Sequence, residues 1–217
     1  MVNEKSQIVH IAFGGLKSLC QCMTKLNDTT SVLAFLKSRK SASAKAMTGP
    51  GPTAAELQEI LEIAVRVPDH GKIAPWRFIK FEGEARAKVG QGFARVWAAN
   101  YPEHGPDSLA FQETLFLRAP VVVAVVSMAA PHAKIPIWEQ HMSAAAVCYN
   151  MVLAATALGY DAQWQSDWVA YDDAAMAVMG VHAPEKIAGL IYIGHSSVVL
   201  EDRPRPDISK LVTVWSV

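Results

Sequence analysis

Val121-Val-Val-Ala-Val-Val126 is a continuous apolar run in which five of the six residues are β-branched. A run of this length and composition is typical of a strand that is buried on both faces of a sheet. Residues 187–193 have the same character and predict a second buried strand that ends at Gly194. Between the two runs, residues 138–158 predict a long helix, apolar nearly all round, that stops at Gly159. A helix of this kind must be surrounded, either by its own core or by that of a partner chain.

Shorter elements flank this centre. A first helix is expected to begin with a cap at Asp28 or Thr29 and to end near Arg39, and a second to begin with a capping box of Thr53 and Glu56 and to be closed by Pro68. The other expected elements are strands at 76–81 and 162–165, helices at 84–100, 108–118 and 172–179 (the last capped by Asp172 or Asp173), and an edge strand in the tail, 204–217. Helices on a central sheet, without strict alternation, indicate an α+β chain.

The chain has 217 residues, of which 51% are hydrophobic and 18% charged, and this is enough for one sizeable core. We expect residues 29–217 to form a single domain. Residues 1–28 are expected to be an N-terminal extension, disordered or the product of a mis-called start, with Met23 as a more ordinary beginning.

Charge balance limits the partners of the chain. Lys plus Arg equals Asp plus Glu, at 20 each. This neutrality argues against a nucleic acid, which requires a basic footprint, and against a polybasic membrane surface. Low charge and high apolar content are typical of a chain that buries surface against a copy of itself.

The cysteines and apolar stretches indicate a cytoplasmic protein. Cys20, Cys22 and Cys148 form an odd set without framework spacing, which favours reduced thiols over disulfides. A metal pair at Cys20 and Cys22 would need a second pair, which the sequence lacks. No apolar stretch is long enough to span a membrane, and residues 1–22 lack a clear signal-peptide cleavage site.

Motifs of hydrolases and nucleotide-binding loops are missing from the sequence. It contains no G-x-S-x-G elbow, no Walker loop and no H-E-x-x-H zinc motif. Gly90-Gln-Gly92 lacks the third glycine and the preceding strand of a dinucleotide fingerprint. We therefore expect no catalytic side chain and no metal, and a reaction whose difficult step belongs to a bound cofactor.

Four polar groups remain as candidates for a ligand site. They are Ser38-Arg-Lys-Ser-Ala-Ser43, Arg66-Val-Pro-Asp-His70 with Pro75-Trp76, Trp164-Gln-Ser-Asp167 and Arg203-Pro-Arg205-Pro-Asp207. As binding elements, the first group would clamp a phosphate, the second would contact a polar ligand, the third would be a strand end that holds a ligand, and the fourth would present a stiff pair of arginines to an anion. As structural elements, the first group would be a solvated helix end, the second a capping turn, the third a buried tryptophan with polar neighbours, and the fourth a charged linker. Composition alone leaves both interpretations open.

The order of the motifs resembles the nitroreductase family, most closely its small YdjA-like branch. S-R-K-S-A-S, R-V-P-D-H with P-W, W-E-Q-H-M-S-A-A-A, W-Q-S and Y-I-G follow one another here, and the branch carries R-R-S-A-S, R-A-P-D-H with P-W, W-E-Q-x-M-S-A and W-R-S in the same order. The similarity spans about residues 30–195. It implies a nitroreductase-like fold with a mixed central sheet flanked by helices, FMN as cofactor, and an intertwined homodimer with flavin sites at the subunit interface.

The resemblance also assigns cofactor-binding residues. Those expected to bind FMN are Arg39, Lys40, Ser41, Arg66, His70, Trp164, Gln165, Ser166 and Arg205. The first three would contact the phosphate and the ring edge, the Arg66 and His70 pair would reach the flavin from the second subunit, the Trp164-Gln-Ser166 segment would lie along the ring, and Arg205 would meet the phosphate.

Two positions depart from the branch. Gln165 stands where arginine is usual, so only a main-chain contact to the flavin would survive there, and Ala74 stands where a close relative has glutamine. Residues 154–159 fall where the nicotinamide cofactor has been placed in the branch, but this segment is predicted here as buried helix.

The activity that the resemblance implies is hydride transfer from NADPH or NADH to FMN, followed by reduction of a small-molecule electron acceptor such as a nitroaromatic or a quinone. Two substrates that use one face of the flavin in turn imply ping-pong kinetics. The alternatives on the same scaffold are another enzyme, such as a dehydrogenase or a flavin-modifying enzyme, and a flavin-binding module without redox activity. The departures at Gln165 and Ala74 keep the latter open.

Overall fold

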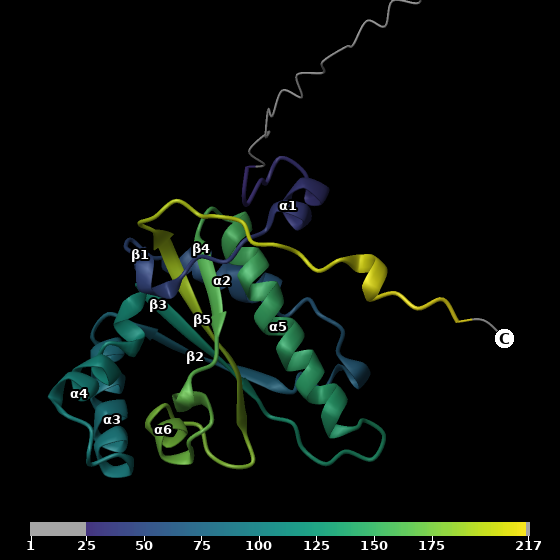
Figure 1. Cartoon of the computed structure of the whole chain (residues 1–217). Coiled ribbons are helices and arrows are strands. Elements are labelled where there is room, and N and C mark those ends of the chain that lie inside the picture. The colour runs from purple at the N-terminus through teal and green to yellow at the C-terminus, as the bar shows by residue number, and fades with distance from the viewer. Residues whose placement is uncertain (1–24, 216–217) are drawn as a thin grey trace, which may run out of the picture.

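The computed structural model describes residues 25–215. The expected extension therefore lies outside the described residues up to position 24, as do Cys20 and Cys22. The chain has an α+β fold, as expected, built on a five-stranded sheet in the order β1-β5-β3-β2, with β4 also paired to β5 (Figure 1). Every strand pair in it is antiparallel. The strands are β1 Met47–Thr48, β2 Trp76–Glu82, β3 Val121–Ser127, β4 Asp161–Gln165 and β5 Lys186–Ser196.

The α-helices lie around this sheet, and those other than α1 cover its two faces. They are α1 Val32–Ser38, α2 Ala54–Ala64, α3 Glu84–Asn100, α4 Pro106–Glu113, α5 Ile137–Ala157 and α6 Asp173–Val178. Figure 1 shows α3, α4 and α6 on one side of the strands and α2 and α5 on the other. Five short 3-10 turns complete the described elements: Ala44–Ala46, His70–Lys72, Leu115–Arg118, Trp168–Ala170 and Ile208–Lys210. In the part of the chain that the structure describes, no helix is both long and apolar enough to cross a membrane.

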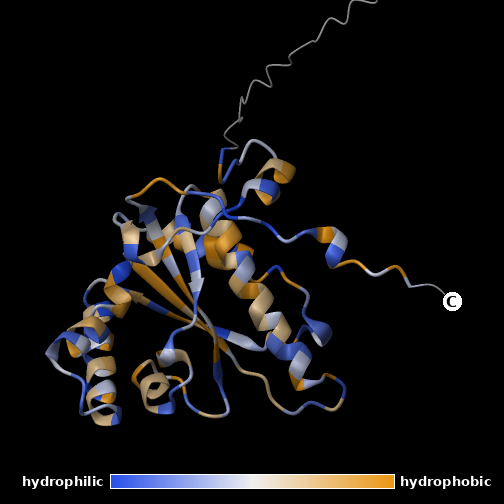
Figure 2. Ribbon diagram, in the orientation of Figure 1, coloured by the Kyte–Doolittle hydropathy of each residue, from blue (hydrophilic) through white to orange (hydrophobic). Residues whose placement is uncertain are grey.

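All seven residues of β3 are buried, which confirms the expectation from the valine run. Side chains alternate along a strand, so β3 contributes to both halves of the core. Val122, Ala124 and Val126 belong to the cluster that includes Phe93 of α3. The intervening residues Val121, Val123 and Val125 belong to the cluster that includes Met151 of α5. Figure 2 shows the apolar strands at the centre of the molecule.

Helix α5 is confirmed almost to the residue, and its burial is one-sided. Gly159 has φ 90° and stops it, with the Tyr160 N–H donating to the carbonyl of Ala155. One side of α5 packs on the sheet, whereas Trp138, Met142 and Tyr149 remain exposed in the single chain. A helix that is apolar on its outer side as well indicates a surface that another body covers.

The glycines inside α3 are explained by close packing between helices. A Cβ on Gly90 would lie 2.1 Å from the carbonyl oxygen of Glu113 in α4, and a Cβ on Gly92 would lie 2.3 Å from Val178 of α6. The predicted helix at 84–100 therefore forms as expected, despite two residues of poor helix propensity.

The helix caps are partly as predicted. The capping box of Thr53 and Glu56 is present at α2, and Asp172 caps α6. The expected cap of α1 was wrong, because Ser31 accepts the Ala34 N–H at 3.1 Å. Asp28 is engaged elsewhere: its carboxylate accepts the Thr30 N–H in a local turn.

Two expected boundaries were also wrong. The helix at 108–118 divides at Thr114, where hydrogen bonding tightens into a 3-10 turn that buries Leu115 and Phe116. Strand β5 continues past Gly194, which pairs with Asp161. Gly194 is needed because a Cβ there would lie 2.7 Å from Pro120 and 2.9 Å from the Thr48 carbonyl oxygen.

The edge strand expected in the tail does not form within residues 204–215. This segment, the C-terminal arm, makes only local backbone hydrogen bonds, such as Lys210 N–H to the Asp207 carbonyl. Figure 1 shows it projecting from the body. Within residues 25–215, no strand pairs with this apolar alternation.

Candidate functional site

The segment after α1 places Arg39 and Lys40 against α5 and the first described residues. Arg39 donates from Nη1 to Ser41 Oγ at 3.1 Å, and its guanidinium lies 5.8 Å from the ring centroid of Tyr149. The Lys40 N–H donates to the side-chain oxygen of Asn27 at 2.8 Å. The end of a short helix is thereby fixed with both cations half-buried.

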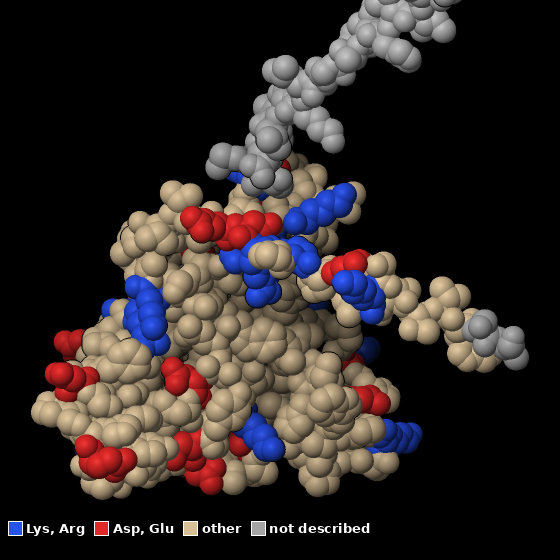
Figure 3. Space-filling model, viewed as in Figure 1, with Lys and Arg blue, Asp and Glu red and all other residues tan. Residues whose placement is uncertain are grey.

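The arginine-proline segment lies close to these cations. Arg205 forms an ion pair with Asp202, which also accepts the Arg203 N–H at 2.8 Å. The Arg203 backbone N–H, the Arg205 guanidinium and the charge of Lys40 together hold the pKa of Asp202 below its ordinary value. Lys40 acts on Asp202 although the two residues are 162 positions apart in the sequence, so tertiary structure has brought the two basic segments together. Figure 3 shows Lys and Arg side chains gathered near the point where the C-terminal arm leaves the body.

The end of β4 joins the same region. The Ala44 N–H, at the end of the Ser38-Arg-Lys-Ser-Ala-Ser43 segment, donates to the side-chain oxygen of Gln163 at 2.5 Å. Gln165 donates from Nε2 to that same oxygen at 3.1 Å, which holds its amide against β4. Ser166 follows the strand and is exposed. The first bond joins the residue that follows the first candidate group to the residue that precedes the third, and the effect of Lys40 on Asp202 puts the arginine-proline segment near the first.

Trp164 is half-exposed, not buried as the structural interpretation required. Its indole Nε1–H donates to the Ala188 carbonyl at 3.2 Å. The ring lies over Gly189, where a Cβ would come within 2.1 Å of Nε1. The missing side chain at position 189 therefore sets how closely the indole approaches β5.

In the single chain, the Arg66–His70 group lies apart from the other three candidate groups. Asp69 accepts the Ala74 N–H at 2.8 Å, as the capping-turn interpretation expected. His70 Nδ1 lies 2.7 Å from the Glu139 carboxylate of α5, while Arg66 is exposed. Among residues 25–215, no hydrogen bond or ion pair links Arg66 or His70 to Arg39, the arginine-proline segment or the end of β4.

Other chemistry is limited in the described chain. Cys148 is fully buried, and burial raises its pKa to about 12, so it is a neutral thiol and not a nucleophile near neutral pH. Within residues 25–215, no three His, Cys, Asp or Glu side chains are grouped to hold a metal. Ala154, Ala155 and Thr156, where a nicotinamide contact would fall, are buried in α5.

Sequence reasoning missed several partners of the site. Tyr149, Gln163 and Glu139 are positioned by α5 and β4. Tyr149 and Glu139 contact the candidate residues Arg39 and His70, and Gln163 contacts Ala44, next to the first candidate group; each partner is more than 60 positions away. Their only local signal was membership of the long apolar helix at 138–158 or of the short strand at 162–165. The contacts depend on helix packing and strand register.

The sequence model of the nitroreductase family matches residues 36–195, which is most of the chain. This chain belongs to the nitroreductase family. A Haemophilus influenzae protein with the provisional name NAD(P)H nitroreductase is 36% identical over 163 residues, covering 75% of this chain and 86% of that protein. The YdjA protein of Escherichia coli K12, with the same provisional name, is 34% identical over 164 residues, with the same shares covered. The resemblance read from the motifs is thus confirmed.

Solved structures confirm the nitroreductase fold. A nitroreductase-like family protein from Bacillus cereus superposes with a TM-score of 0.71 at 23% identity, over 85% of this chain and 96% of that one. A Bacteroides fragilis nitroreductase with bound FMN gives a TM-score of 0.63 at 22% identity, over 86% of this chain and 99% of that one. The overall fold of this chain is therefore that of the family.

Proposed function

We propose that the chain is an FMN-dependent NAD(P)H oxidoreductase that acts as a homodimer. One observation carries the proposal: the segment after α1, which holds Arg39, Lys40 and Ser41, lies beside both the Asp202–Arg205 segment and β4. The names of the Haemophilus influenzae and Escherichia coli relatives, as NAD(P)H nitroreductases, support the same activity. The FMN in the Bacteroides fragilis structure supports the cofactor.

The donor set fits the phosphate of FMN. Arg39, Lys40 and Arg205 provide a forked guanidinium, a point charge and a second guanidinium, and Ser41 provides a hydroxyl. Arg205 forms an ion pair with Asp202 in this structure, and its guanidinium would contact both Asp202 and the phosphate. We propose that these four side chains hold the phosphate, with Arg39 extending to the pyrimidine edge of the ring.

The end of β4 fits the flavin ring through its main chain. The Gln165 side-chain amide already donates to the Gln163 side chain. A main-chain contact with the ring does not require the Gln165 side chain to replace the usual arginine. Trp164 presents an exposed indole edge beside the strand end. We propose that the main chain of residues 164–166 lies along the ring.

The bound flavin would accept hydride from NADPH or NADH and pass it to the acceptor. The role of this chain is to bind and orient the ring, and to place the Arg39 charge where negative charge develops on reduction. No side-chain acid or base is needed for such a role. We propose nitroaromatics and quinones as acceptors, and a ping-pong mechanism because both substrates use one face. Parallel lines in double-reciprocal plots would support it, and intersecting lines would contradict it.

The second subunit is proposed to complete the site. Arg66 and His70 are separate from the other groups in one chain, and the exposed side of α5 has an apolar surface at Trp138, Met142 and Tyr149. The C-terminal arm adds Trp215, which is 81% exposed. Surfaces of this kind are buried in obligate dimers. The cytoplasmic location and the 29–217 domain boundary stay predictions.

Purification tests the cofactor directly. The protein should be yellow, and NADPH should bleach it anaerobically. A colourless protein that stays unreduced after FMN is added contradicts the proposal. A protein that binds FMN but is not bleached by NADPH or NADH supports the flavin-binding module instead.

Arg39→Ala tests the phosphate and ring contacts. We expect FMN affinity to fall about 10- to 100-fold, since a charge-assisted contact contributes about 1.5–3 kcal/mol. Lys37→Ala is the matched control, because Lys37 is exposed on the same helix turn and makes no ion pair with the described residues. Equal affinities of both variants, measured by flavin fluorescence, would contradict the assignment.

Trp215→Asp tests the dimer. We expect the dimer dissociation constant to rise about tenfold or more, as for a buried aromatic at an interface. Lys210→Asp on the same arm is the control. A wild-type protein that is monomeric by light scattering would contradict the shared site.

A further inference from the structure

The polar side chains of the W-E-Q-H-M-S-A segment, residues 138–144, have no role in the function proposed so far. Glu139 and Ser143 belong to this segment, and Asn150 follows on the same helix, α5. Successive members of this set are four and seven positions apart, so the three side chains share one face of the helix. All three make hydrogen bonds to residues 63–70, which form the end of α2 and the turn that carries His70.

Two of these side chains hold the backbone that precedes His70. Ser143 Oγ donates to the Pro68 carbonyl at 2.6 Å, and Asn150 Nδ2 donates to the Ile63 carbonyl at 2.6 Å. The acceptors are 75 and 87 positions away in the sequence. Ser143 is buried and requires a partner, and the end of α2 leaves carbonyl groups without partners in the helix. Both bonds are therefore explained by the stability of the fold.

The turn that follows Pro68 has an uncommon backbone conformation. Gly71, Lys72 and Ala74 have φ values of 74°, 57° and 46°, in the left-handed region that residues other than glycine rarely adopt. Such a backbone persists only where its surroundings fix it. Ile135, just before α5, packs closely enough that a Cβ on Gly71 would lie 2.5 Å from its Cδ1. The turn is therefore held in one conformation against the start of α5.

Glu139 has no comparable structural explanation. Its Oε2 lies 2.7 Å from His70 Nδ1, and the two side chains are 47% and 59% exposed. Neither group needs this partner because of burial, and an exposed ion pair contributes little to stability. An ionised carboxylate only accepts hydrogen bonds, so His70 donates from Nδ1, and Nε2 is left on the opposite side of the ring to meet a ligand. The pair fixes the direction of the imidazole.

The pair lies at the surface that the second subunit is proposed to cover. A hollow of about 380 Å³ is lined by His70 and Glu139 together with Trp138 and Met142 of the exposed apolar side of α5. A partner copy that covers this side of α5 would bring its own flavin site up to His70. The arrangement therefore needs a second chain at this surface and no opening to solvent.

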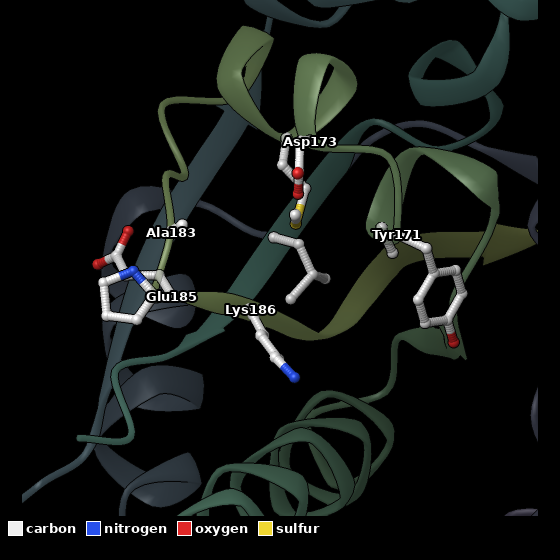
Figure 4. A pocket seen from close by; sticks show the side chains of 9 residues that line it. Tyr171, Asp173, Ala183, Glu185 and Lys186 are labelled. Carbon is white, nitrogen blue, oxygen red and sulfur yellow. The ribbon is translucent and has the colours of Figure 1, made fainter. Parts of the chain in front are cut away.

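The ionic groups beside α6 show no such arrangement. Figure 4 shows a cavity of about 420 Å³ there, in which the Lys186 side chain points away from Asp173 and Glu185. Glu185 accepts hydrogen bonds from Arg77 at 2.6 and 2.7 Å. The charged groups of this cavity diverge, whereas Glu139 and His70 meet.

From this geometry we infer that Glu139 is a positioning residue, which orients His70 of one chain toward the flavin bound by the other chain. The inference rests on the proposed function for the flavin and for the contact that His70 makes with it. Glu139 itself contacts neither the cofactor nor a substrate. Helix α5 would thus form part of the dimer surface and, through Glu139, direct a ligand of the flavin across that surface.

Flavin affinity measures the positioning. Glu139→Ala should raise the FMN dissociation constant about five- to tenfold, because an untethered imidazole must be ordered when the flavin binds. Glu139→Gln should stay within about twofold of the wild type, because its amide oxygen still accepts the Nδ1–H of His70. Equal losses of affinity in the Ala and Gln variants would overturn the inference, since orientation would then not be the cause.

Glu84→Ala is the matched control. Like Glu139, Glu84 lies in the first turn of its helix, and it forms an exposed ion pair, with Lys88 at 3.6 Å. Loss of a carboxylate from a helix start should lower Tm to a similar small extent in both alanine variants. Only Glu139→Ala should weaken FMN binding. A loss of FMN affinity that Glu84→Ala shares would assign the effect to the helix start and overturn the inference.

A double-mutant cycle identifies His70 as the group through which Glu139 acts. His70→Ala should weaken FMN binding at least as much as Glu139→Ala does. Adding Glu139→Ala to His70→Ala should change the dissociation constant by less than about twofold, because the group to be oriented is gone. Effects of the two substitutions that multiply would overturn the inference.

These measurements also separate the inference from the proposed function, because binding needs no turnover. Coupled losses of FMN affinity support the positioning role even if NADPH does not bleach the holoprotein. A protein that is bleached by NADPH, but whose FMN affinity Glu139→Ala leaves unchanged, retains the proposed function and overturns the inference. A wild-type protein that binds no FMN contradicts both.

Discussion

Gly189→Ala is expected to destabilise the fold and disturb the end of β4 at the same time. Gly189 is buried in β5 opposite Val125. A Cβ there would lie 2.1 Å from Trp164 Nε1, 2.6 Å from its Cδ1 and 3.0 Å from Cys148 Sγ. The indole, which is 39% exposed, can swing outward, but only by leaving the Ala188 carbonyl.

Two contributions set the size of the effect. Forcing extra volume into a packed site costs about 1–3 kcal/mol. The lost indole hydrogen bond costs about 1 kcal/mol more. A total of about 2–4 kcal/mol should lower Tm by about 4–16 °C in a chain of this size. FMN affinity should fall as well, because the displaced indole lies beside the proposed ring site.

Thermal unfolding followed by circular dichroism, together with FMN titration, measures both effects. Gly105→Ala is the control: no atom lies within 4 Å of its added Cβ, and its φ is −73°. In a Trp164→Ala background, Gly189→Ala should cost at least about 1 kcal/mol less than in the wild type, because the colliding atoms are gone. An unchanged Tm for the single variant, or purely additive effects in the double variant, would refute this reasoning.

The remaining predictions concern stability. Gly90→Ala should destabilise the protein by about 3 kcal/mol in urea unfolding, because the new Cβ meets the fixed backbone oxygen of Glu113 at 2.1 Å; a neutral result would mean that α3 and α4 separate freely. Thr53→Ala should cost about 1 kcal/mol by removing the capping box of α2, with Thr53→Ser retaining most of it. Hydrogen bonds from Arg77 hold the pKa of Glu185 below its ordinary 4.5. A carboxyl group whose pKa is lower in the folded state stabilises the fold at pH values above its unfolded pKa, and this stabilisation is lost as the pH falls. The stability deficit of Arg77→Gln should therefore be full at about pH 7 and shrink towards about pH 3. A deficit that is constant over this range would contradict the pairing.

Local patterns in the sequence were sufficient for most of the elements. The valine run predicted β3, the long apolar stretch ending at Gly159 predicted α5, and the Thr53 capping box predicted the start of α2. These signals work because strand alternation, helix period and caps involve residues within a few positions of one another. The ordered motifs also identified the family, which the family comparison confirmed.

Other boundaries needed the packed chain. Nothing local indicates that the helix at 108–118 tightens at Thr114, because that change is driven by burial of Phe116 against distant strands. Gly194 reads as a strand end, yet it lies inside β5 because Pro120 and the Thr48 carbonyl approach it too closely for any larger residue. The glycine serves close packing and not a turn.

By itself, the sequence determined which segments are strands and helices, which side chains are chemically able to bind an anion, and the family. Only the tertiary structure decided which of them meet. The Ala44 bond to Gln163 spans 119 positions, and Ser127 reaches His141 across a strand end and a helix. Such pairings depend on the register of β4 and β3 against β5 and on the packing of α5 on the sheet, quantities that no pattern within a few residues can contain.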